Sequence, residues 1–293
     1  MLLQATHTTR YLYEEPVTQC ISEARVTPRA FPGQRVATSR IEIHPEPAVM
    51  VERTDYFGNH VHSFSLFRSH DRFTTTATSV VEVEKREPAE PSKLPWEQAR
   101  DRISAHADES VLPAFEFVFE SPFVVLSPEL AAYGRTVFEP GRPLAEAVEA
   151  LSHRIHEDFT YLPKSTSIDM PLLEVFHNRC GVCQDFSHIM IAVLRSLRLP
   201  ARYVSGYLRS GKNFQGADAS HAWVSAFVPG TGEGGEWLSF DPTNDMIPSD
   251  GHVTLGWGRD YGDVTPVKGI ALGGGHQTVE VEVYVRPVSA EQA

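Results

Sequence analysis

Hydrophobic and polar positions alternate over short stretches in the first part of the chain. Between Thr8 and Val83, runs rich in Val, Ile, Thr, Tyr and Phe are separated by Pro and Gly, the pattern of strands joined by turns. Gly58-Asn59 lies between two such runs and predicts a hairpin turn. Valine then alternates with glutamate from Ser79 to Glu84, where we expect a last strand. The pattern predicts a β-rich N-terminal domain over residues 1–86.

The pattern changes after this domain. Residues 87–96 combine three prolines with charged residues and no apolar period, which is typical of a linker. Residues 97–293 are expected to form a second domain with helices and strands. Valines at 279, 281, 283 and 285 predict a half-exposed strand, which we assign to this second domain. Helical steps of three and four separate Leu144, Ala147, Val148, Leu151 and Ile155.

One helix is predicted to begin at a cysteine. The segment CGVCQDFSH occupies residues 180–188, and apolar residues continue at helical spacing up to Leu197, before Pro200. Cys183 therefore lies at or near the first turn. Unpaired backbone N–H groups and the positive end of the helix dipole stabilise a thiolate there, and the same N–H groups suit an oxyanion.

A histidine and an aspartate follow on two predicted strands. Residues 219–227 read as one strand, and residues 236–244 read as a second strand broken by Pro242. The turn-rich connection between them favours antiparallel pairing, which would bring His221 close to Asp241. A nucleophilic cysteine needs a base and a group that orients the base, and these residues are candidates for both roles.

These segments resemble a known family. GVCQDFSH, SHAW and DPTN are similar to the core motifs of the transglutaminase-like superfamily. The HTTRY segment from His7, Pro28-Arg29 and DYFGN at 55–59 resemble the N-terminal region of bacterial transglutaminase-like proteins, described as candidate cysteine proteases. Residues 258–264 resemble the C-terminal portion of that group. The resemblance implies an α+β protein, with a β-rich N-terminal domain and a papain-like transglutaminase core.

The resemblance also implies roles for three residues: Cys183 as nucleophile, His221 as general base and then acid, and Asp241 as the residue that orients the imidazole. The reaction would be acyl transfer on a peptide or isopeptide amide through a thioester. Water as the second attacker would make the enzyme a peptidase or amidase, and an amine would make it a transglutaminase. We favour hydrolysis, because an indiscriminate crosslinker without evident calcium control would be hazardous. The alternative of another class is a non-catalytic peptide-binding module.

Two further residues are candidates for the site. In animal transglutaminases a tryptophan upstream of the cysteine helps to form the oxyanion hole, but here the nearest is Trp96, in the expected linker. Tyr161 lies closer to the cysteine and is our candidate donor, together with the backbone N–H of Cys183. Trp223 follows His221 by two positions on the same face of a strand, where it either lines the substrate cleft or packs the core.

Composition limits the possible partners. The apolar share is 41% and the charged share 22%, which excludes a disordered or coiled-coil chain. A net charge of −12 would repel phosphate backbones and anionic lipids, so we expect a peptide or protein substrate and neither nucleic acid nor membrane. No signal peptide or apolar run of about 18 residues is found, so we expect a cytoplasmic protein. The sequence gives no indication of the oligomeric state.

The cysteines leave other chemistry open. The sequence contains three, of which Cys180 and Cys183 form a CxxC pair. Such a pair elsewhere indicates zinc or redox chemistry, and His188 and His221 are the histidines a zinc ion would recruit. No second CxxC, paired histidine spacing or EF-hand loop completes a metal site. We therefore expect no cofactor and no metal.

Overall fold

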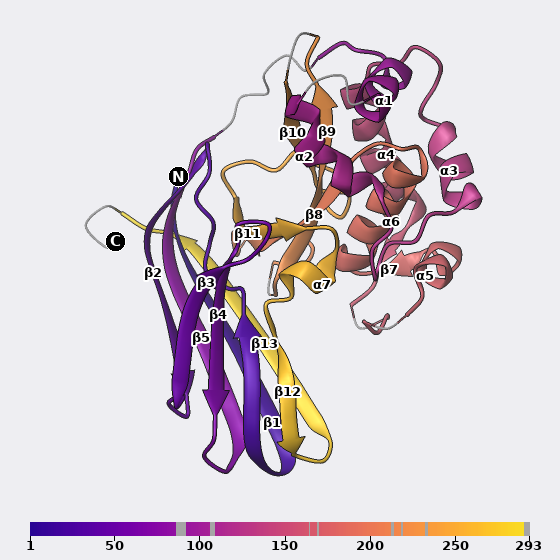
Figure 1. The fold of residues 1–293 in the computed structure, drawn as a ribbon. Helices are drawn as coiled ribbons and strands as arrows, with labels where there is room; N and C mark the ends of the chain where they lie inside the picture. Colours follow the sequence, from indigo (N-terminus) through magenta and orange to yellow (C-terminus); the bar gives the residue numbers. More distant parts are fainter. Residues whose placement is uncertain are drawn as a thin grey trace.

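A computed structural model describes residues 1–85, 92–105, 109–163, 165–168, 170–211, 214–217, 219–231 and 234–289. Its α+β fold confirms the expected class: an elongated sheet lies beside a compact mixed part (Figure 1). The strands are β1 (Leu2–Ala24), β2 (Gln34–His44), β3 (Val49–Thr54), β4 (His60–Leu66), β5 (His70–Val83), β6 (Thr160–Tyr161), β7 (Cys180–Gly181), β8 (Ala201–Leu208), β9 (His221–Pro229), β10 (Gly235–Phe240), β11 (His252–Gly258), β12 (Val267–Gly273) and β13 (Gln277–Pro287). The helices are α1 (Trp96–Ser104), α2 (Leu112–Phe115), α3 (Pro128–Arg135), α4 (Leu144–Asp158), α5 (Leu172–Asn178), α6 (Cys183–Ser196) and α7 (Tyr261–Val264), with two 3₁₀ turns at Glu109–Val111 and Glu116–Val118.

The elongated sheet is organised around β1. This strand of 23 residues pairs with β5 and β13 along its first part and with β4 and β12 along its last part. Strands β2 and β3 complete the sheet at its two edges. The hairpin predicted at Gly58-Asn59 joins β3 to β4, and the strand expected at 79–84 is the end of β5. The β-rich N-terminal region is therefore confirmed.

The last two strands do not join the second part of the chain. The strand predicted around 279–285 exists as β13, but both β12 and β13 pair antiparallel with β1. The assignment of these strands to the second domain is therefore corrected by their hydrogen bonds. Val283 and Val285 are buried, whereas Val279 and Val281 are 46% and 40% exposed. The alternation at these valines fits any sheet with one covered face, so it did not show which sheet they join.

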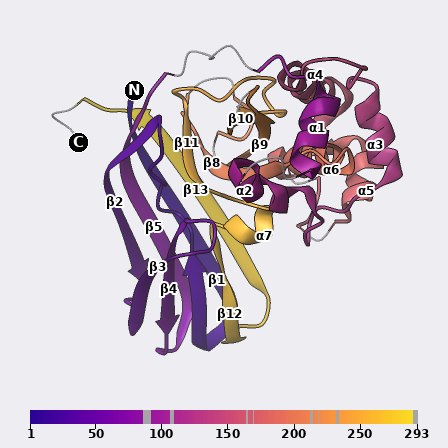
Figure 2. The same cartoon turned by 45° about the horizontal axis from the view of Figure 1, so that its top comes forward.

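The second part is built around helix α6. Strands β10, β9, β8 and β11 form an antiparallel sheet in that order, and α6 packs on it against β8 and β9. The other long helices surround α6 on the side away from the elongated sheet (Figure 2). Twelve of the 14 residues of α6 are buried, which makes it a central helix and not the one-sided helix that its apolar spacing indicates. The expected α4 helix is also present, with its apolar stripe buried.

The expected linker is only partly described. Residues 87–91 lie outside the described residues, so this part of the prediction stays open. Trp96, which we placed in the linker, instead begins α1 and is 8% exposed. Its indole packs against Phe138 and donates a hydrogen bond of 3.0 Å to the carbonyl oxygen of Glu139. The prolines and charges before Trp96 gave no indication that the tryptophan itself is buried.

Two amide side chains join the sheets to each other. Gln34 donates to the carbonyl oxygen of Thr254 and accepts from its N–H, both at 2.8 Å. Asn59 makes the same pair of bonds with the backbone of Trp257, at 2.8 and 3.0 Å. Both amides thus hydrogen-bond to the edge of β11 that faces away from β8. The absence of a side chain at Gly256 is required here, since a Cβ would lie 2.4 Å from Oδ1 of Asn59.

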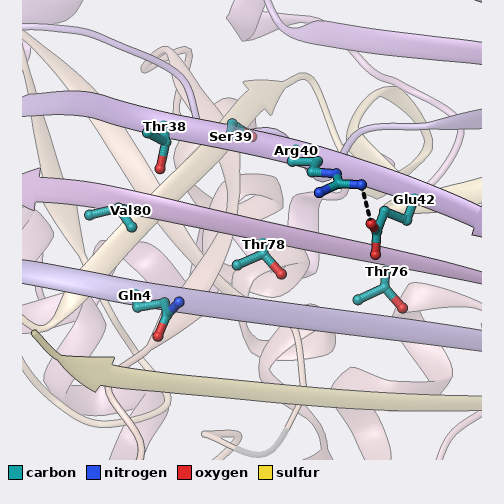
Figure 3. A pocket seen from close by; sticks show the side chains of 8 residues that line it. All are labelled: Gln4, Thr38, Ser39, Arg40, Glu42, Thr76, Thr78 and Val80. Carbon is teal, nitrogen blue, oxygen red and sulfur yellow. Dashed lines mark ion pairs between the residues drawn. The ribbon is translucent and has the colours of Figure 1, made fainter. Parts of the chain in front are cut away.

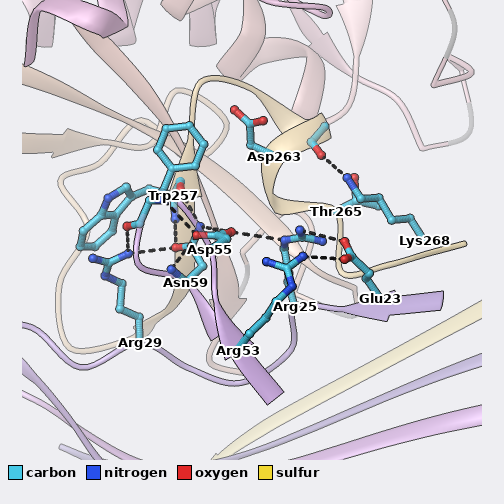
Figure 4. Close-up of polar contacts among 12 residues, drawn as sticks. Glu23, Arg25, Arg29, Arg53, Asp55, Asn59, Trp257, Asp263, Thr265 and Lys268 are labelled. Carbon is cyan, nitrogen blue, oxygen red and sulfur yellow. Dashed lines mark hydrogen bonds and ion pairs between the residues drawn. The ribbon is translucent and has the colours of Figure 1, made fainter. Parts of the chain in front are cut away.

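Stacked cations continue this junction, and Figure 4 shows one of them, Arg29, next to Trp257. The guanidinium of Arg29 lies 3.5 Å from the ring centre of Trp257, and that of Arg202 lies 3.9 Å from the same ring. Asp55 orders the loop that carries Asn59 by accepting its backbone N–H at 2.9 Å. The residues that resemble the bacterial N-terminal region therefore build the contact between the two sheets.

Apolar packing completes the junction. A separate cluster joins the elongated sheet to β8 and β11 and excludes water from the contact. The cluster comprises Leu3, Ala5, Val81, Val83, Tyr207, Val253, Leu255, Val283 and Val285.

No helix within the described ranges combines the length and the apolar character needed to cross a bilayer.

A buried histidine at this junction predicts acid sensitivity. Nδ1 of His7 lies 2.9 Å from the hydroxyl of Tyr207, and Nε2 lies 2.9 Å from Oγ1 of Thr9. Burial lowers the pKa of His7 from 6.5 to about 4. The contribution of the neutral His7 to stability is therefore complete above pH 6.5 and is lost as the pH falls towards 4. At that pH the loss in the free energy of unfolding reaches about 3 kcal/mol for one histidine. In urea unfolding between pH 4 and 7, His7→Gln should show a shallower loss of stability than the wild type.

The exposed His44 supplies the matched control, because His44→Gln changes the same residue type on a solvated strand. It should retain the wild-type dependence on pH. Equal slopes in the wild type and His7→Gln would show that His7 does not cause the acid sensitivity.

Candidate active site

Helix α6 begins at Cys183, as expected. Val182 before it is extended, and the carboxylate of Asp185 accepts the Val182 N–H at 2.8 Å, which fixes the start of the helix. Asp185 also accepts a bond of 2.7 Å from the hydroxyl of Thr166. Burial raises the pKa of Asp185, although both hydrogen bonds oppose the shift. The side chain of Cys183 is thereby held at a defined place, 8% exposed, at the N-terminal end of α6.

The predicted strand pair places His221 beside Asp241. Strands β9 and β10 are antiparallel, and Phe240 pairs with Val224 at the last step of the ladder. His221 is the first residue of β9, and Asp241 directly follows β10. Nε2 of His221 lies 2.8 Å from Oδ2 of Asp241, and both side chains are completely buried. The geometry confirms that the two residues are brought into contact.

Asp241 accepts several hydrogen bonds. Its Oδ1 accepts the backbone N–H groups of Thr243 and Asn244, at 3.0 and 3.2 Å. The amide of Asn244 donates to Oδ2 at 2.9 Å, and Nε2 of His252 lies 3.4 Å from the same oxygen. These contacts replace the water that a buried carboxylate loses. The carboxylate is therefore fixed in position as well as desolvated.

His221 and Asp241 shift each other's pKa in opposite directions. Burial alone would lower the pKa of His221, but the Asp241 carboxylate and the nearby Cys183 outweigh it and raise that pKa. Burial would raise the pKa of Asp241, but His221 outweighs it and holds that pKa well below its usual range. Their opposite shifts favour an imidazolium next to a carboxylate.

The remaining nitrogen of His221 is available to the cysteine. Among the described residues, Nδ1 is buried and has no hydrogen-bond partner by geometry. The sulfur of Cys183 lies 4.0 Å from the carbonyl oxygen of Ser220, the residue just before His221. Cys183 is also one of the groups that raise the pKa of His221. The three side chains therefore form one continuous cluster in the order Cys183, His221, Asp241.

Tyr161 lies at the same site. It pairs in parallel with Gly181, two residues before Cys183. A Cβ at Gly216 would lie 2.9 Å from Nδ1 of His221 and 3.4 Å from the hydroxyl of Tyr161. The hydroxyl and the imidazole nitrogen thus approach the same point from different elements. The backbone of Gly216, with φ +83°, fits closely over both groups.

The amide of Asn244 holds this covering segment in place. Its Oδ1 accepts the N–H of Gln215 at 2.9 Å, while its Nδ2 donates to Asp241. Asn244 and His252 were not predicted as site residues. Asn244 lies within the DPTN segment, where an aspartate followed by proline indicates a turn with its own local hydrogen bonds. His252 has no such signal, because it reaches Asp241 from a different strand.

Trp223 packs beside both site histidines, with its ring centre 6.2 Å from that of His221. It is 2% exposed, and its ring meets that of His252 edge-on at 5.3 Å and 88°. Trp223 and His252 line a cleft of about 620 Å³, whose described lining includes neither Cys183 nor His221. The role of Trp223 at a substrate cleft therefore stays a prediction.

The CxxC segment and His188 have separate environments. His188 is buried, stacks on Phe123, and accepts the N–H of Tyr261 at 3.2 Å. Burial lowers the pKa of His188 to about 3. Cys180 is partly exposed and is not in a disulfide. Within the described ranges, no three His, Cys, Asp or Glu side chains gather in a way that would hold a metal ion.

Another depression lies on the outer face of the elongated sheet, on β1, β2 and β5. It has a volume of about 430 Å³, and half of its lining residues are threonine or serine. Figure 3 shows the ion pair of Arg40 with Glu42 at one end of it. Its lining includes no residue of the Cys183 cluster. This face resembles an ordinary solvated sheet surface.

Comparisons with known families agree with this architecture. Residues 3–82 match the family described as the bacterial transglutaminase-like N-terminal region, and residues 131–242 match the transglutaminase-like superfamily. The chain belongs to the transglutaminase-like superfamily, in the group that carries this N-terminal region. The superfamily includes cysteine proteases and transglutaminases.

Several individual proteins are similar. An uncharacterized protein of Mycobacterium tuberculosis is 37% identical over 98% of this chain and 93% of its own length. One of Mycobacterium leprae is 34% identical over 97% of this chain and 98% of its own length. A protein-glutamine gamma-glutamyltransferase of Pseudomonas aeruginosa is 35% identical, but only over 36% of this chain and 17% of its own length.

A solved structure shares the whole fold. It is a candidate cysteine protease from Cytophaga hutchinsonii, with a TM-score of 0.77 and 20% identity. The match covers 99% of this chain and 91% of that one. The expected papain-like transglutaminase fold is confirmed at the level of architecture.

The environment of His221 predicts an unusual titration. Its imidazole should keep its proton at pH values where an exposed histidine has lost it, because Asp241 stabilises the cation. The pair's contribution to stability from this proton is complete below pH 6.5 and is lost as the pH rises through the raised pKa of His221. In Asp241→Asn the pKa should fall, since burial remains and the carboxylate charge is gone. Ring nitrogen chemical shifts followed against pH by NMR measure this change.

Asp71→Asn is the matched control, because Asp71 is an exposed carboxylate on the elongated sheet. It should leave the His221 titration unchanged. If Asp241→Asn also leaves it unchanged, Asp241 is not the source of the raised pKa.

Proposed function

We propose that this protein catalyses cysteine-dependent acyl transfer on peptide or isopeptide amide bonds, with hydrolysis favoured. The observation that carries the proposal is the 2.8 Å contact between His221 and Asp241, which leaves Nδ1 of the imidazole without a hydrogen-bond partner among the described residues, while Cys183 is near enough to raise the pKa of His221. Membership in the superfamily supports a cysteine enzyme of this kind. The substrate class is a peptide or protein, and we propose neither nucleic acid nor membrane as a partner.

The chemistry follows from the order of the three side chains. In the resting pair the thiol proton of Cys183 has already passed to Nδ1 of His221, and the Cys183 thiolate attacks the amide carbonyl carbon. The imidazolium then gives its proton to the departing nitrogen, which leaves as an amine or ammonia while a thioester remains. Water then attacks the thioester carbon while the neutral imidazole takes a proton from it, and the C–S bond breaks, which releases the acid and restores the Cys183 thiolate beside the imidazolium. Asp241 keeps the imidazole aligned and stabilises its charged form in both halves.

An oxyanion forms on the carbonyl oxygen during each attack. The backbone N–H of Cys183 is one proposed donor, since it lies in the first turn of α6 and has no helical partner upstream. The hydroxyl of Tyr161 is the second proposed donor, because it approaches the same point as Nδ1 of His221. Trp96 does not support this role, since its indole N–H already binds Glu139 in the core.

A transglutaminase is the second candidate function. Over 116 residues the chain is 35% identical to a protein-glutamine gamma-glutamyltransferase, and this similarity favours an amine as the second attacker. The same thioester and the same imidazole base serve both reactions. The two functions therefore differ only in which nucleophile reaches the thioester.

We predict that the wild type cleaves members of a peptide library and that Cys183→Ala does not, because the thioester requires the sulfur. Mass spectrometry with and without an added primary amine measures the outcome. Hydrolysis products that persist in the presence of the amine favour the peptidase. Release of ammonia together with incorporation of the amine favours the transglutaminase, and equal products from Cys183→Ala contradict both.

Alkylation separates an enzyme from a peptide-binding module with the same fold. Iodoacetamide at neutral pH should label Cys183 faster than Cys180, although Cys183 is the more buried of the two. His221→Ala should slow the labelling of Cys183 by about tenfold or more and leave Cys180 as an internal control. A rate at Cys183 that is no faster than at a model thiol, and unchanged in His221→Ala, favours the binding module.

Tyr161→Phe tests the proposed oxyanion donor. Loss of one such hydrogen bond lowers kcat by about 10²–10³ with little change in KM. Steady-state kinetics on a peptide identified from the library measures both constants. Tyr56→Phe, at a site 81% exposed in the turn between β3 and β4, is the matched control and should retain full activity. A Tyr161→Phe enzyme with wild-type kcat would remove Tyr161 from the mechanism.

A further inference from the structure

The cleft behind Trp223 is built by both parts of the chain. Its walls come from the start of β2 and the end of β5 on one side, and from α4, β10 and residues 247–249 on the other. Its volume of about 620 Å³ lies in the range of sites for small organic ligands. Neither sequence similarity nor the proposed reaction assigns a role to it.

The larger apolar side chains that line the cleft, which we call its floor, are partly aromatic. When the hydrocarbon part of a ligand covers such a floor, the burial of apolar surface lowers the free energy and favours binding. Among the floor side chains, Ile247 is 46% exposed, which leaves apolar surface for a ligand to cover. The floor comprises Phe31, Trp223, Trp237, Leu238, Phe240 and Ile247.

The charged groups of the cleft all have one sign. The lining contains Glu84, Glu146, Glu149 and Glu236, and no lysine or arginine among the residues described there. None of these four carboxylates forms an ion pair with a described residue. Arg202 stacks on Trp237 but does not belong to the lining. Among the described residues the cleft therefore combines an apolar floor with a negative rim that no cation of its lining balances, and such a rim attracts cations.

We propose that this cleft binds an organic cation, an ammonium or guanidinium group on an apolar stem. The stem would cover the aromatic floor while the charged end meets the glutamates of α4, and this group occurs both on lysine side chains of peptides and on free diamines. The proposal concerns a site separate from Cys183, so it does not depend on the proposed reaction.

The position of the cleft connects it to the buried aspartate. His252 lies in its wall, and Nε2 of His252 is 3.4 Å from Oδ2 of Asp241. Trp223 in the same wall contacts the ring of His252. A ligand on this wall is therefore one side chain away from Asp241, and His252 provides a local reporter of binding.

Binding is tested by isothermal titration calorimetry on the full chain with 1,5-diaminopentane and with Nα-acetyl-lysine amide, whose side-chain amine keeps its positive charge. Hexanoate and 1-pentanol serve as the anionic and neutral probes. We expect saturable binding of at least one cation, weakened by salt, and none of the uncharged or anionic probes. If only Nα-acetyl-lysine amide binds, the natural ligand is a lysine side chain of a peptide. If both cations bind, the site also accepts free diamines.

The double variant Glu146→Gln/Glu149→Gln locates the site. Both side chains are exposed on α4, and the variant should weaken cation binding by about tenfold or more while its circular dichroism stays unchanged. Glu157→Gln, on the same helix but outside the cleft, is the matched control and should bind as the wild type does. The ring signals of His252 should shift on titration with the ligand.

Two results would overturn the proposal. One is the absence of saturable cation binding up to about 10 mM. The other is binding that keeps its wild-type affinity in the double variant, since a cation held near Cys183 would behave in that way.

Discussion

A single buried carboxylate organises the candidate site. Asp241 is inaccessible to water, and the free energy of desolvation is offset only because His221, Asn244 and two backbone N–H groups bind it at once. Each of these partners belongs to a segment whose position is then fixed: strand β9, the turn after β10 and, through Asn244, the residues that cover the imidazole. Alignment of the histidine is therefore a property of the packed site and does not arise from one hydrogen bond.

Hydrogen bonds between fully paired polar groups also hold the two sheets together. Gln34 and Asn59 bind the backbone of β11 in the way that a neighbouring strand would, and the Trp257 ring is enclosed by the guanidinium groups of Arg29 and Arg202. Apolar residues from β1, β5 and β13 fill the remaining contact. The elongated sheet thus fixes β11, whose first residue is His252, and so contributes indirectly to the surroundings of Asp241.

Much of the site follows from the sequence, because local patterns determine it. The pairing of two strands joined by a short connection predicts that His221 meets Asp241, and the resemblance to the family adds Cys183 at the start of its helix. Long-range pairing is different. The alternating valines near residue 280 do not reveal that their partner strand begins at Leu2, and His252 reaches Asp241 only through the register of a separate strand. Burial of Trp96 was equally hidden, since it depends on packing against Phe138.

The capped edge of β11 also limits how this chain can be divided. A fragment that starts after β5 would lose Gln34 and Asn59, and the outer edge of β11 would present unsatisfied N–H and C=O groups to other molecules. Such an open edge is a template for intermolecular β-sheet and hence for aggregation. A division of the chain at the linker would therefore separate the core segment from the two side chains that protect this edge against self-association.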